Sequence, residues 1–453
     1  MKNKNTTQAQ LSKLAAFRQS VYGCLTKARD ALFELLEAVL TTPQLAAFPE
    51  LSGAPVFRRQ WPSVYEALQD GAVDTAALLQ LEVAALPPTD RPLLVGDHTA
   101  WTRAQARTLR DRTFEHQPVV IKGQKPITIG HGYSTLGVVP EPGGNWFLPL
   151  LHERIPSETA PSVKMAQQLQ TVCPPLAQRP LGLFDSEYGS GRFLVETKDV
   201  TCDLLFRIRP NRKLRCAPPP YPGFGRPARH GAVFRLSDPA TGPPANEAWE
   251  VQDEKLGPLK IQRWDNLHFE DAPARPLTLL RVERVNARKT RRDPGVIWLG
   301  YCGAQPLPPQ SALWREYLSR YVIEHWYRFL KQSLHWTLPQ LGTPEQGELW
   351  STLLVIASWE LWLARGAAPD APRPWQKPQA PEKMTPGRVH QGMGAVMAGI
   401  GTPASAPKPR GKSPGWPKGR VRTKRTRYAV VKKTPPKVPA VAKSTTTTPQ
   451  AVP

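Results

Sequence analysis

Tyr317-Leu-Ser-Arg-Tyr-Val-Ile-Glu-His-Trp-Tyr-Arg-Phe-Leu-Lys331 is the stretch of this 453-residue chain that decides its fold. No Pro or Gly interrupts it, and an apolar residue returns every three or four positions, as an amphipathic helix requires. At about 100° per residue, Tyr317, Arg320, Glu324, Arg328 and Lys331 fall within an arc of roughly 80°. The opposite face is apolar, comprising Leu318, Val322, Ile323, Trp326, Phe329, Leu330 and Leu334. We therefore expect the apolar face to be buried, while the other face presents one carboxylate among three cations and a phenol.

The polar face of this helix has two interpretations. A solvated charged face is the ordinary one, but surface helices usually alternate the two signs of charge to gain pairs three or four residues apart. Here a single acid, Glu324, lies between Arg320 and Arg328. A carboxylate flanked by cations also suits a site where a metal ion and a phosphodiester meet. Spacing alone leaves both interpretations open.

The composition indicates a polyanionic partner. The formal net charge is +23 and the isoelectric point is near 10.0, which favours nucleic acid, with a ribosomal or anionic-membrane partner as the alternative on charge alone. Five cysteines are scattered without paired spacing, which argues against a zinc site or a disulfide framework. The longest apolar run, Leu353–Leu363, contains Glu360 and is too short to span a bilayer. We expect a soluble, cytoplasmic protein.

The apolar pattern divides the chain into three parts. Residues 1–90 are expected to be helical, either as a DNA-binding or partner-binding region or as a packing extension of the core. Residues 91–365 alternate strands and helices, with a mostly β insertion at about 214–288. Residues 366–453 hold sixteen of the 51 prolines and seventeen Lys or Arg against two acids, so we expect a disordered basic tail that attracts phosphates.

Two short apolar strands each end on an acid. The first, from Pro92, ends at Asp97, and the second, from Pro180, ends at Asp185. Between them, 126–139 and 145–151 predict a hairpin beside the first strand, and a helix begins near Ser162. A further helix or turn and a strand at 204–208 follow. This order predicts an α/β fold with a sheet of mixed direction.

Acids at two strand ends and on a helix can converge on one site. Carboxylates so placed can hold two divalent cations, one activating water or a 3′-hydroxyl and the other stabilising the leaving oxygen at phosphorus. Mg²⁺ prefers oxygen ligands and retains waters, so two or three carboxylates suffice. The candidates are Asp97, Asp185 and Glu324.

This layout resembles the bacterial insertion-sequence transposases of the DDE class, which have a ribonuclease H-like core, and most of all the insertion sequence 4 / insertion sequence 701 group. The order is Asp97, Asp185, a β-rich insertion and Glu324, with Tyr317, Arg320 and Lys331 on the last helix. Gly-Asp97-His-Thr resembles the first-acid strand of the family, and Leu-Phe-Asp185-Ser-Glu-Tyr-Gly resembles the second. The resemblance covers about residues 90–365. The helix motif is fairly specific, whereas each Asp alone is a weak signal.

The resemblance implies that Asp97, Asp185 and Glu324 are catalytic and hold two Mg²⁺ ions, for which Mn²⁺ substitutes. It also implies double-stranded DNA as the partner, as terminal inverted repeats and target DNA, with a homodimer across paired ends in the bacterial nucleoid. Trp249 and Trp264 of the insertion are candidates for stacking on a displaced base, although burial in a small β module is the commoner role. Residues expected to contact DNA are Tyr317, Arg320, Arg328 and Lys331 on the helix, those two tryptophans, and Lys408, Arg410, Lys412, Lys418, Arg420, Arg422, Lys424, Arg425 and Arg427 in the tail.

Two other functions stay open at this point. The chain could be a non-catalytic, transposase-derived DNA-binding protein, which the presence of all three acids disfavours, or a structure-specific nuclease of the same fold. Near the acids, we expect His98 to be structural, His131 to pack on the hairpin and Glu187 to be a solvated loop acid.

Overall fold

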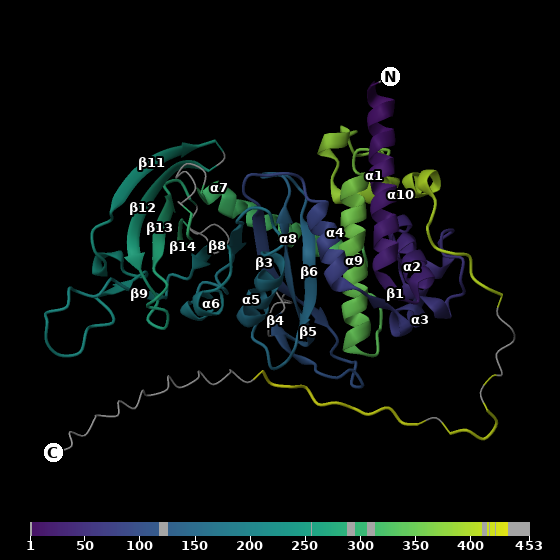
Figure 1. The fold of residues 1–453 in the computed structure, drawn as a ribbon, viewed down its shortest axis with the longest axis horizontal. Helices are drawn as coiled ribbons and strands as arrows, with labels where there is room; N and C mark the ends of the chain where they lie inside the picture. The colour runs from purple at the N-terminus through teal and green to yellow at the C-terminus, as the bar shows by residue number, and fades with distance from the viewer. Residues whose placement is uncertain are drawn as a thin grey trace, which may run out of the picture.

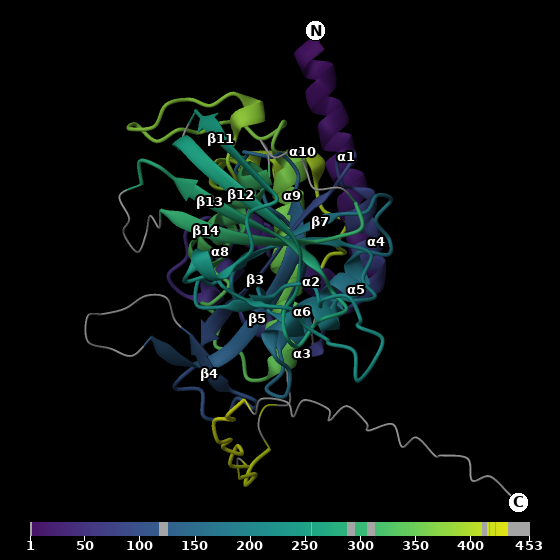
Figure 2. The same ribbon diagram turned by 90° about the vertical axis from the view of Figure 1, so that its left-hand side faces the viewer.

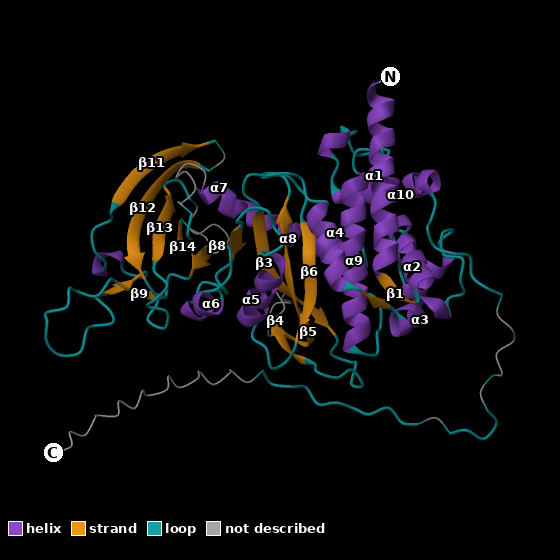
Figure 3. Ribbon diagram, viewed as in Figure 1, coloured by secondary structure: helices purple, strands orange, loops and turns teal. Residues whose placement is uncertain are grey.

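The structure is a computed structural model that describes residues 2–116, 126–254, 256–287, 295–305, 313–409, 415, 417–421 and 423–433, with side chains from residue 7 onward. A large sheet runs through the molecule, and a group of helices formed by both ends of the chain packs beside it (Figure 1). The secondary structure is therefore mixed α/β, with strands in the middle of the chain and most long helices near its ends (Figure 3).

Within these ranges one mixed sheet contains ten strands, in the order β11-β12-β13-β14-β8-β7-β3-β5-β4, with β6 also paired to β5. Strands β3, β7 and β8 are parallel neighbours, whereas β5 runs antiparallel to β3 and β6 antiparallel to β5. The predicted hairpin beside the first strand is thus present. The strands are β3 (Leu93–Thr102), β4 (Thr113–His116), β5 (Ile127–Val139), β6 (Leu148–Ile155), β7 (Leu181–Phe184), β8 (Asp203–Ile208), β11 (Glu247–Asp253), β12 (Gly257–Leu267), β13 (Leu277–Arg284) and β14 (Val296–Cys302).

The strands expected in the insertion are present, but most of them extend the main sheet. Strand β14 pairs with β13 on one side and with β8 on the other, so β11 to β14 continue the central sheet without a break. A separate two-stranded sheet joins β9 (Lys213–Arg215) to β10 (Val233–Arg235), beside the short 3-10 helix η2 (Pro239–Thr241). Phe234, Trp264 and Trp298 pack against one another where this small sheet meets the large one.

The N-terminal region packs on the core as a helical layer. Helix α1 lies against α9, and its Arg18 side chain is buried between Glu37 and Glu360. Ala28, in the left-handed region at φ 47°, separates α1 from α2. These contacts favour the packing interpretation of residues 1–90. The elements are α1 (Lys2–Cys24), β1 (Leu25–Lys27), α2 (Arg29–Thr41), η1 (Phe48–Gly53), α3 (Pro62–Asp70), β2 (Ala72–Val73), α4 (Thr75–Ala84) and α9 (Pro344–Ala364).

The expectation that everything after residue 365 is disordered is wrong for its first part. Helix α10 (Pro386–Ile400) buries Val389, Met393, Val396 and Met397, and it packs on α2 and α9. Those four residues recur at helical spacing, but the glycines and prolines around them hid the pattern. A short 3-10 helix, η4 (Pro381–Lys383), precedes α10.

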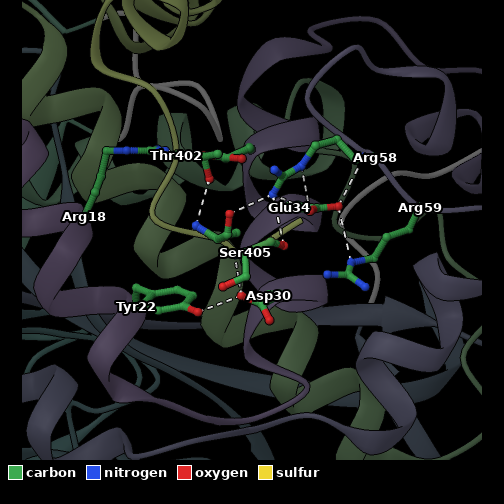
Figure 4. A network of polar contacts seen from close by, with 10 residues as sticks. Arg18, Tyr22, Asp30, Glu34, Arg58, Arg59, Thr402 and Ser405 are labelled. Carbon is green, nitrogen blue, oxygen red and sulfur yellow. Dashed lines mark hydrogen bonds and ion pairs between the residues drawn. The ribbon is translucent and has the colours of Figure 1, made fainter. Parts of the chain in front are cut away.

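Hydrogen bonds connect the segment after α10 to the N-terminal region (Figure 4). Arg58 Nη2 donates to Ala404 O at 2.8 Å and forms an ion pair with Glu34. The Ser405 N–H donates to Asp30 Oδ1 at 2.8 Å, and the Tyr22 hydroxyl donates to the same oxygen at 2.6 Å. The two ends of the chain therefore fold as one layer.

The stretch from Tyr317 to Lys331 is helical, as predicted, with one local tightening. Helix α7 (Leu313–Leu318) passes through the 3-10 turn η3 (Ser319–Tyr321) into α8 (Val322–Gln332). Helices α5 (Pro161–Val172) and α6 (Gly191–Glu196) connect the parallel strands. No helix in the described ranges is long and apolar enough to cross a membrane. All five cysteines are free thiols.

Candidate active site

Asp97 and Asp185 lie side by side because their strands are parallel neighbours. Gly96 of β3 pairs with Phe184 of β7, so each acid is the next residue on adjoining strands, which are about 4.8 Å apart. Gly96 is required for this close packing, since a Cβ there would lie 2.5 Å from the Phe184 ring and 2.6 Å from Met165 Sδ. The prediction that the two strands are neighbours is confirmed, but the prediction that the first strand ends at Asp97 is wrong, because β3 pairs with β5 as far as Thr102.

Helix α8 brings Glu324 to the same place, with Arg320 between the acids. Arg320 Nη2 donates to Glu324 Oε1 at 2.9 Å, and Nη1 lies 3.8 Å from Asp97 Oδ2. The Arg320 side chain is 8% exposed, whereas that of Glu324 is 50% exposed. A buried guanidinium thus joins an acid of the sheet to an acid that faces solvent.

The cluster carries more negative than positive charge. Burial raises the pKa of Asp97 to about 6, and the neighbouring Asp185 carboxylate adds to the rise, while His98 and Arg320 oppose it. Burial also works to lower the pKa of Arg320, but Tyr317 and the surrounding acids raise it by more, so the guanidinium stays charged. Two carboxylates side by side with one shared cation favour the arrival of a further positive charge.

Backbone hydrogen bonds fix one oxygen of each sheet acid. Asp97 Oδ1 accepts from the His98 N–H at 2.8 Å, and Asp185 Oδ1 accepts from the Glu187 N–H at 2.8 Å. These bonds orient both carboxylates without involving the Oδ2 atoms. The Oδ2 atoms therefore remain for a cation or for a nearby guanidinium.

Buried tyrosines surround the acids. Burial, with Asp97 contributing, raises the pKa of Tyr188 and Tyr327 well above 10, so both phenols stay neutral. The Tyr327 hydroxyl donates to Thr135 Oγ1 at 2.8 Å, and Thr135 Oγ1 in turn lies 2.7 Å from His152 Nδ1. Sequence reasoning did not single out Tyr188, which lies in the bend after β7, or Tyr327, which lies on the helix beside its apolar face, because an aromatic residue at either place needs no special explanation.

The polar face of the helical stretch from Tyr317 to Lys331 points mostly inward. Tyr317 is buried, and burial raises its pKa to about 12. Lys331 is partly buried and donates to Thr99 Oγ1 at 2.7 Å, two residues beyond Asp97. Arg328 is exposed. The helical periodicity gave the face correctly, but it could not show that β3 covers most of that face.

The two sheet acids fit a divalent cation better than the full set of three does. Asp97 and Asp185 offer hard oxygen ligands whose mutual repulsion a cation would relieve. Glu324 is engaged with Arg320, and no group of three or more acidic, His or Cys side chains with metal-holding geometry occurs among the residues that the structure describes. Glu324 would have to exchange its ion pair for the metal.

The aromatic candidates in the insertion differ in exposure. Trp264 is 3% exposed and its indole N–H donates to Pro243 O, so its ring is part of the core and cannot stack on a base in this conformation. Trp249 is partly buried in β11. The rings that the insertion does expose are Tyr221, at 54%, and Phe224, at 77%. Phe224 lies between two glycines and Tyr221 between two prolines, so neither belongs to an apolar run that would have indicated it.

Most tail candidates in the described part of the chain are exposed cations. They are Lys408, Lys418, Arg420, Lys424, Arg425 and Arg427. Arg410, Lys412 and Arg422 lie outside the described residues.

The remaining polar residues near the acids have structural contacts. His98 Nδ1 lies 3.4 Å from the Tyr188 hydroxyl, and His131 Nε2 contacts Arg110 O at 2.9 Å. Glu187 forms an exposed ion pair with Arg209 at 2.7 Å.

Comparison with known proteins places this geometry in a wider setting. A family model described as DDE superfamily endonuclease matches residues 20–267, more than half of the chain. The match includes Asp97 and Asp185 and ends before Glu324. No curated protein matches the chain. Among solved structures, a piggyBac transposase synaptic complex with hairpin DNA, determined by cryo-electron microscopy, matches with a TM-score of 0.39 and 8% identity, over 82% of this chain and 72% of that chain. A TM-score and a sequence identity this low support no inference about the present chain.

Proposed function

The chain belongs to the DDE superfamily endonucleases, and from this premise we propose that it is a DNA transposase of the insertion sequence 4 / insertion sequence 701 type. It would bind the terminal inverted repeats of its element, cleave the strands at their ends and join them to target DNA. The observation that carries the proposal is the meeting of Asp97, Asp185 and Glu324 around Arg320.

The strand order supports a ribonuclease H-like core for this activity. Three antiparallel strands, β6, β5 and β3, are followed across the sheet by the parallel strands β7 and β8. The acids stand on the central strand and on the strand next to it. A site that needs carboxylates from separate segments is therefore built on rigid elements, which holds them in place.

Asp97 and Asp185 are the residues that would hold Mg²⁺ or Mn²⁺, with Glu324 completing the set. When bound, two such ions supply an activated water or 3′-hydroxyl and stabilise the leaving oxygen at phosphorus. Arg320 positions Asp97 and Glu324, and Lys331 supports β3 through Thr99. Because Tyr317, Arg320 and Lys331 are wholly or partly covered, we assign them to positioning the acids and not to contacts along the DNA backbone.

Contacts with DNA are assigned to the exposed cations and aromatic rings. Arg328 lies one turn beyond Glu324 and is exposed, so it can reach a phosphate next to the acids. Phe224 and Tyr221 replace Trp264 as candidates for stacking on a base, beside Trp249. The tail cations supply attraction to phosphates that does not depend on sequence.

A second candidate is a nuclease that cuts DNA without joining strands. The description of the matching family names endonuclease activity and no strand transfer, which favours this alternative over a non-catalytic DNA-binding protein. The three acids serve both activities equally well. Only the products of the reaction distinguish them.

The test is cleavage and joining of labelled DNA that carries the inverted repeats flanking the gene, with Mg²⁺ or Mn²⁺. We expect metal-dependent cutting at the repeat boundary and transfer of the cut end to a second duplex. Glu324→Gln should abolish cutting while leaving repeat binding intact. Glu187→Gln is the matched control, since it removes a nearby exposed acid that is paired with Arg209 and not with Arg320.

Each outcome of this test has one meaning. Cutting without joining, and without regard to the repeats, would replace the transposase with the nuclease. Cutting that persists in Glu324→Gln would show that the third acid is misassigned. Binding without cutting in the wild-type protein would favour the non-catalytic alternative.

A further inference from the structure

The basic C-terminal segment returns to the edge of the sheet after leaving the helical layer. The Tyr428 N–H donates to Arg107 O at 2.9 Å, and the Val431 N–H donates to Arg112 O at 2.8 Å. Val431 also forms a parallel bridge with Thr113 of β4, the edge strand beside β5. We call residues 423–433 the strap; it lies against β4 at the end of the yellow trace in Figure 2.

One of the residues that bind the strap is a buried arginine. Arg112 is 3% exposed, and its guanidinium donates to the carbonyl oxygens of Arg103, Ala104 and Leu109. Its Nη2 donates to Tyr428 O at 3.1 Å. A guanidinium in the interior needs an acceptor for its N–H groups, since an unmet donor is costly there. The strap thus supplies part of the hydrogen bonding of a group belonging to the core.

The other residue that binds the strap is a buried acid. Glu115 of β4 is 7% exposed, and Lys433 Nζ of the strap lies 2.7 Å from its Oε1. The Thr113 hydroxyl donates to the same carboxylate. Removing the cation from such a pair would leave an uncompensated buried charge, which is strongly unfavourable. Arg112 and Glu115 together form a docking site for this particular segment.

Apart from Lys433, the cations of the docked strap form no ion pair with a described acid. From residue 406 to residue 433 the sequence contains eleven Lys or Arg and no Asp or Glu. The acids near the strap are already paired: Asp111 with Arg154, Glu345 with Arg110, and Glu115 with Lys433.

Five exposed cations therefore remain along this edge. They are Lys424, Arg425, Arg427 and Lys432 of the strap and Arg107 beside it, and no described carboxylate lies within ion-pair distance of any of them. Such a group of unpaired cations suits a polyanion.

The strap lies on the side of the sheet toward which β3 runs from Asp97, because Val431 bridges Thr113, which pairs through Gly130 of β5 with Thr102 at the end of β3. From Asp97, β3 continues for five residues to Thr102, which is about 17 Å, and the connection to β4 follows. Phosphates on one strand of a duplex are about 3.4 Å apart along its axis. A duplex cut at Asp97 and Asp185 that ran along β3 would pass the strap several base pairs away.

We propose that the strap is a DNA-binding arm that the edge of the sheet holds in a fixed position, so that its cations contact phosphates several base pairs from the cleaved bond. The proposal rests on the proposed function only in taking duplex DNA as the partner. A free basic tail must lose conformational entropy when it binds, whereas a docked arm has lost it on folding. Because Glu115 holds the strap in place through Lys433, this buried acid should strengthen the binding of DNA, although DNA is itself acidic.

The decisive variant is Glu115→Gln, because the two models predict opposite signs. The substitution raises the net charge by one, so a free tail would bind DNA as tightly as before or more tightly. A docked arm loses its anchor at Lys433, and the dissociation constant for a duplex of random sequence should rise about three- to tenfold. Fluorescence anisotropy of a labelled duplex at fixed salt measures it, and equal or tighter binding by Glu115→Gln would overturn the proposal.

A second pair of variants leaves every charge and the core unchanged. Val431→Pro removes the N–H that donates to Arg112 O, while Ala429→Pro places the same residue where the N–H donates to no described acceptor. We expect weaker DNA binding and faster tryptic cleavage at Lys424 to Arg427 for Val431→Pro alone. Equal affinities for both proline variants and wild type would also overturn the proposal. Wild-type cleavage of repeat DNA would be untouched by that result, so failure of the strap and failure of the proposed function are distinguishable.

Discussion

Two clusters in this protein have the same chemical parts and different surroundings. In the helical layer Arg18 lies between Glu37 and Glu360, and all three side chains are at most 2% exposed. In the sheet Arg320 lies between Asp97 and Glu324, with Asp185 beside them, and Glu324 is half exposed. One arginine serves two acids in the first cluster and three in the second.

Charge balance and access to solvent, more than residue type, separate a structural cluster from a candidate catalytic one. The sealed cluster ties α1 to α2 and α9, and nothing can enter it. The open cluster carries an additional negative charge and has one acid at the surface. A cation and a phosphodiester could approach only the second.

The largest expected effect is on catalysis, from Asp185→Asn. Replacing a metal-holding carboxylate with an amide should lower the rate of strand cleavage at least about a thousandfold. The free energy of unfolding should change by less than about 1 kcal/mol, because the Glu187 N–H keeps an oxygen acceptor. Single-turnover cleavage and urea denaturation measure the two quantities. Glu360→Gln is the control in the sealed cluster, and it should cut DNA normally.

The largest expected effect on stability comes from Arg18→Met. It leaves the Glu37 and Glu360 carboxylates buried without a cation, which should lower the free energy of unfolding by about 3–5 kcal/mol. Arg320→Met should cost less, because Glu324 can turn to solvent. Urea denaturation of both variants tests this order, and a greater loss in Arg320→Met would show that the open cluster is the more tightly bound of the two.

A smaller effect, of opposite sign, is expected from Asp97→Asn. Burial raises the pKa of Asp97 from 3.8 to about 6, so its ionisation opposes folding. The penalty is absent below about pH 4, where the group is protonated in both states. It develops between pH 4 and 6 and is complete above pH 6. Asp97→Asn should therefore stabilise the protein by about 1–3 kcal/mol at pH 8 and by less than about 1 kcal/mol at pH 4. Equal effects at both pH values would contradict this electrostatic explanation.

The smallest effect is expected from Arg320→Lys. Lysine keeps the charge but cannot reach Asp97 and Glu324 at once as a planar guanidinium does. We expect about a tenfold slower cleavage at unchanged repeat affinity, with a stability loss near 1 kcal/mol. A loss of repeat binding instead would mean that Arg320 contacts DNA directly. Comparing the affinity with the single-turnover rate separates these outcomes.

Local patterns in the sequence were sufficient to predict much of the fold and the site. Apolar runs marked the strands of Asp97 and Asp185, and periodicity marked the helix of Glu324, because each signal lies within a few residues. The polar residues after Asp97 hid the continuation of β3 to Thr102. The parallel pairing that brings the two aspartates together follows from the alternation of strands and helices.

The features that were missed depend on distant partners. The strap has no apolar periodicity, and its order comes from Arg112 and Glu115, more than 300 residues earlier. Whether β11 to β14 form a separate module or extend the sheet is decided by the pairing of β14 with β8. The inward direction of Tyr317, Arg320 and Lys331 depends on what covers the helix, which periodicity does not contain.

We infer that the open cluster holds a divalent cation and that the sealed cluster does not. The most direct test is a titration of the protein bound to repeat DNA with Mn²⁺, followed by electron paramagnetic resonance. We predict saturable Mn²⁺ binding in the wild-type protein and in Glu360→Gln, and its loss in Asp185→Asn. Undiminished Mn²⁺ binding in Asp185→Asn would contradict the claim.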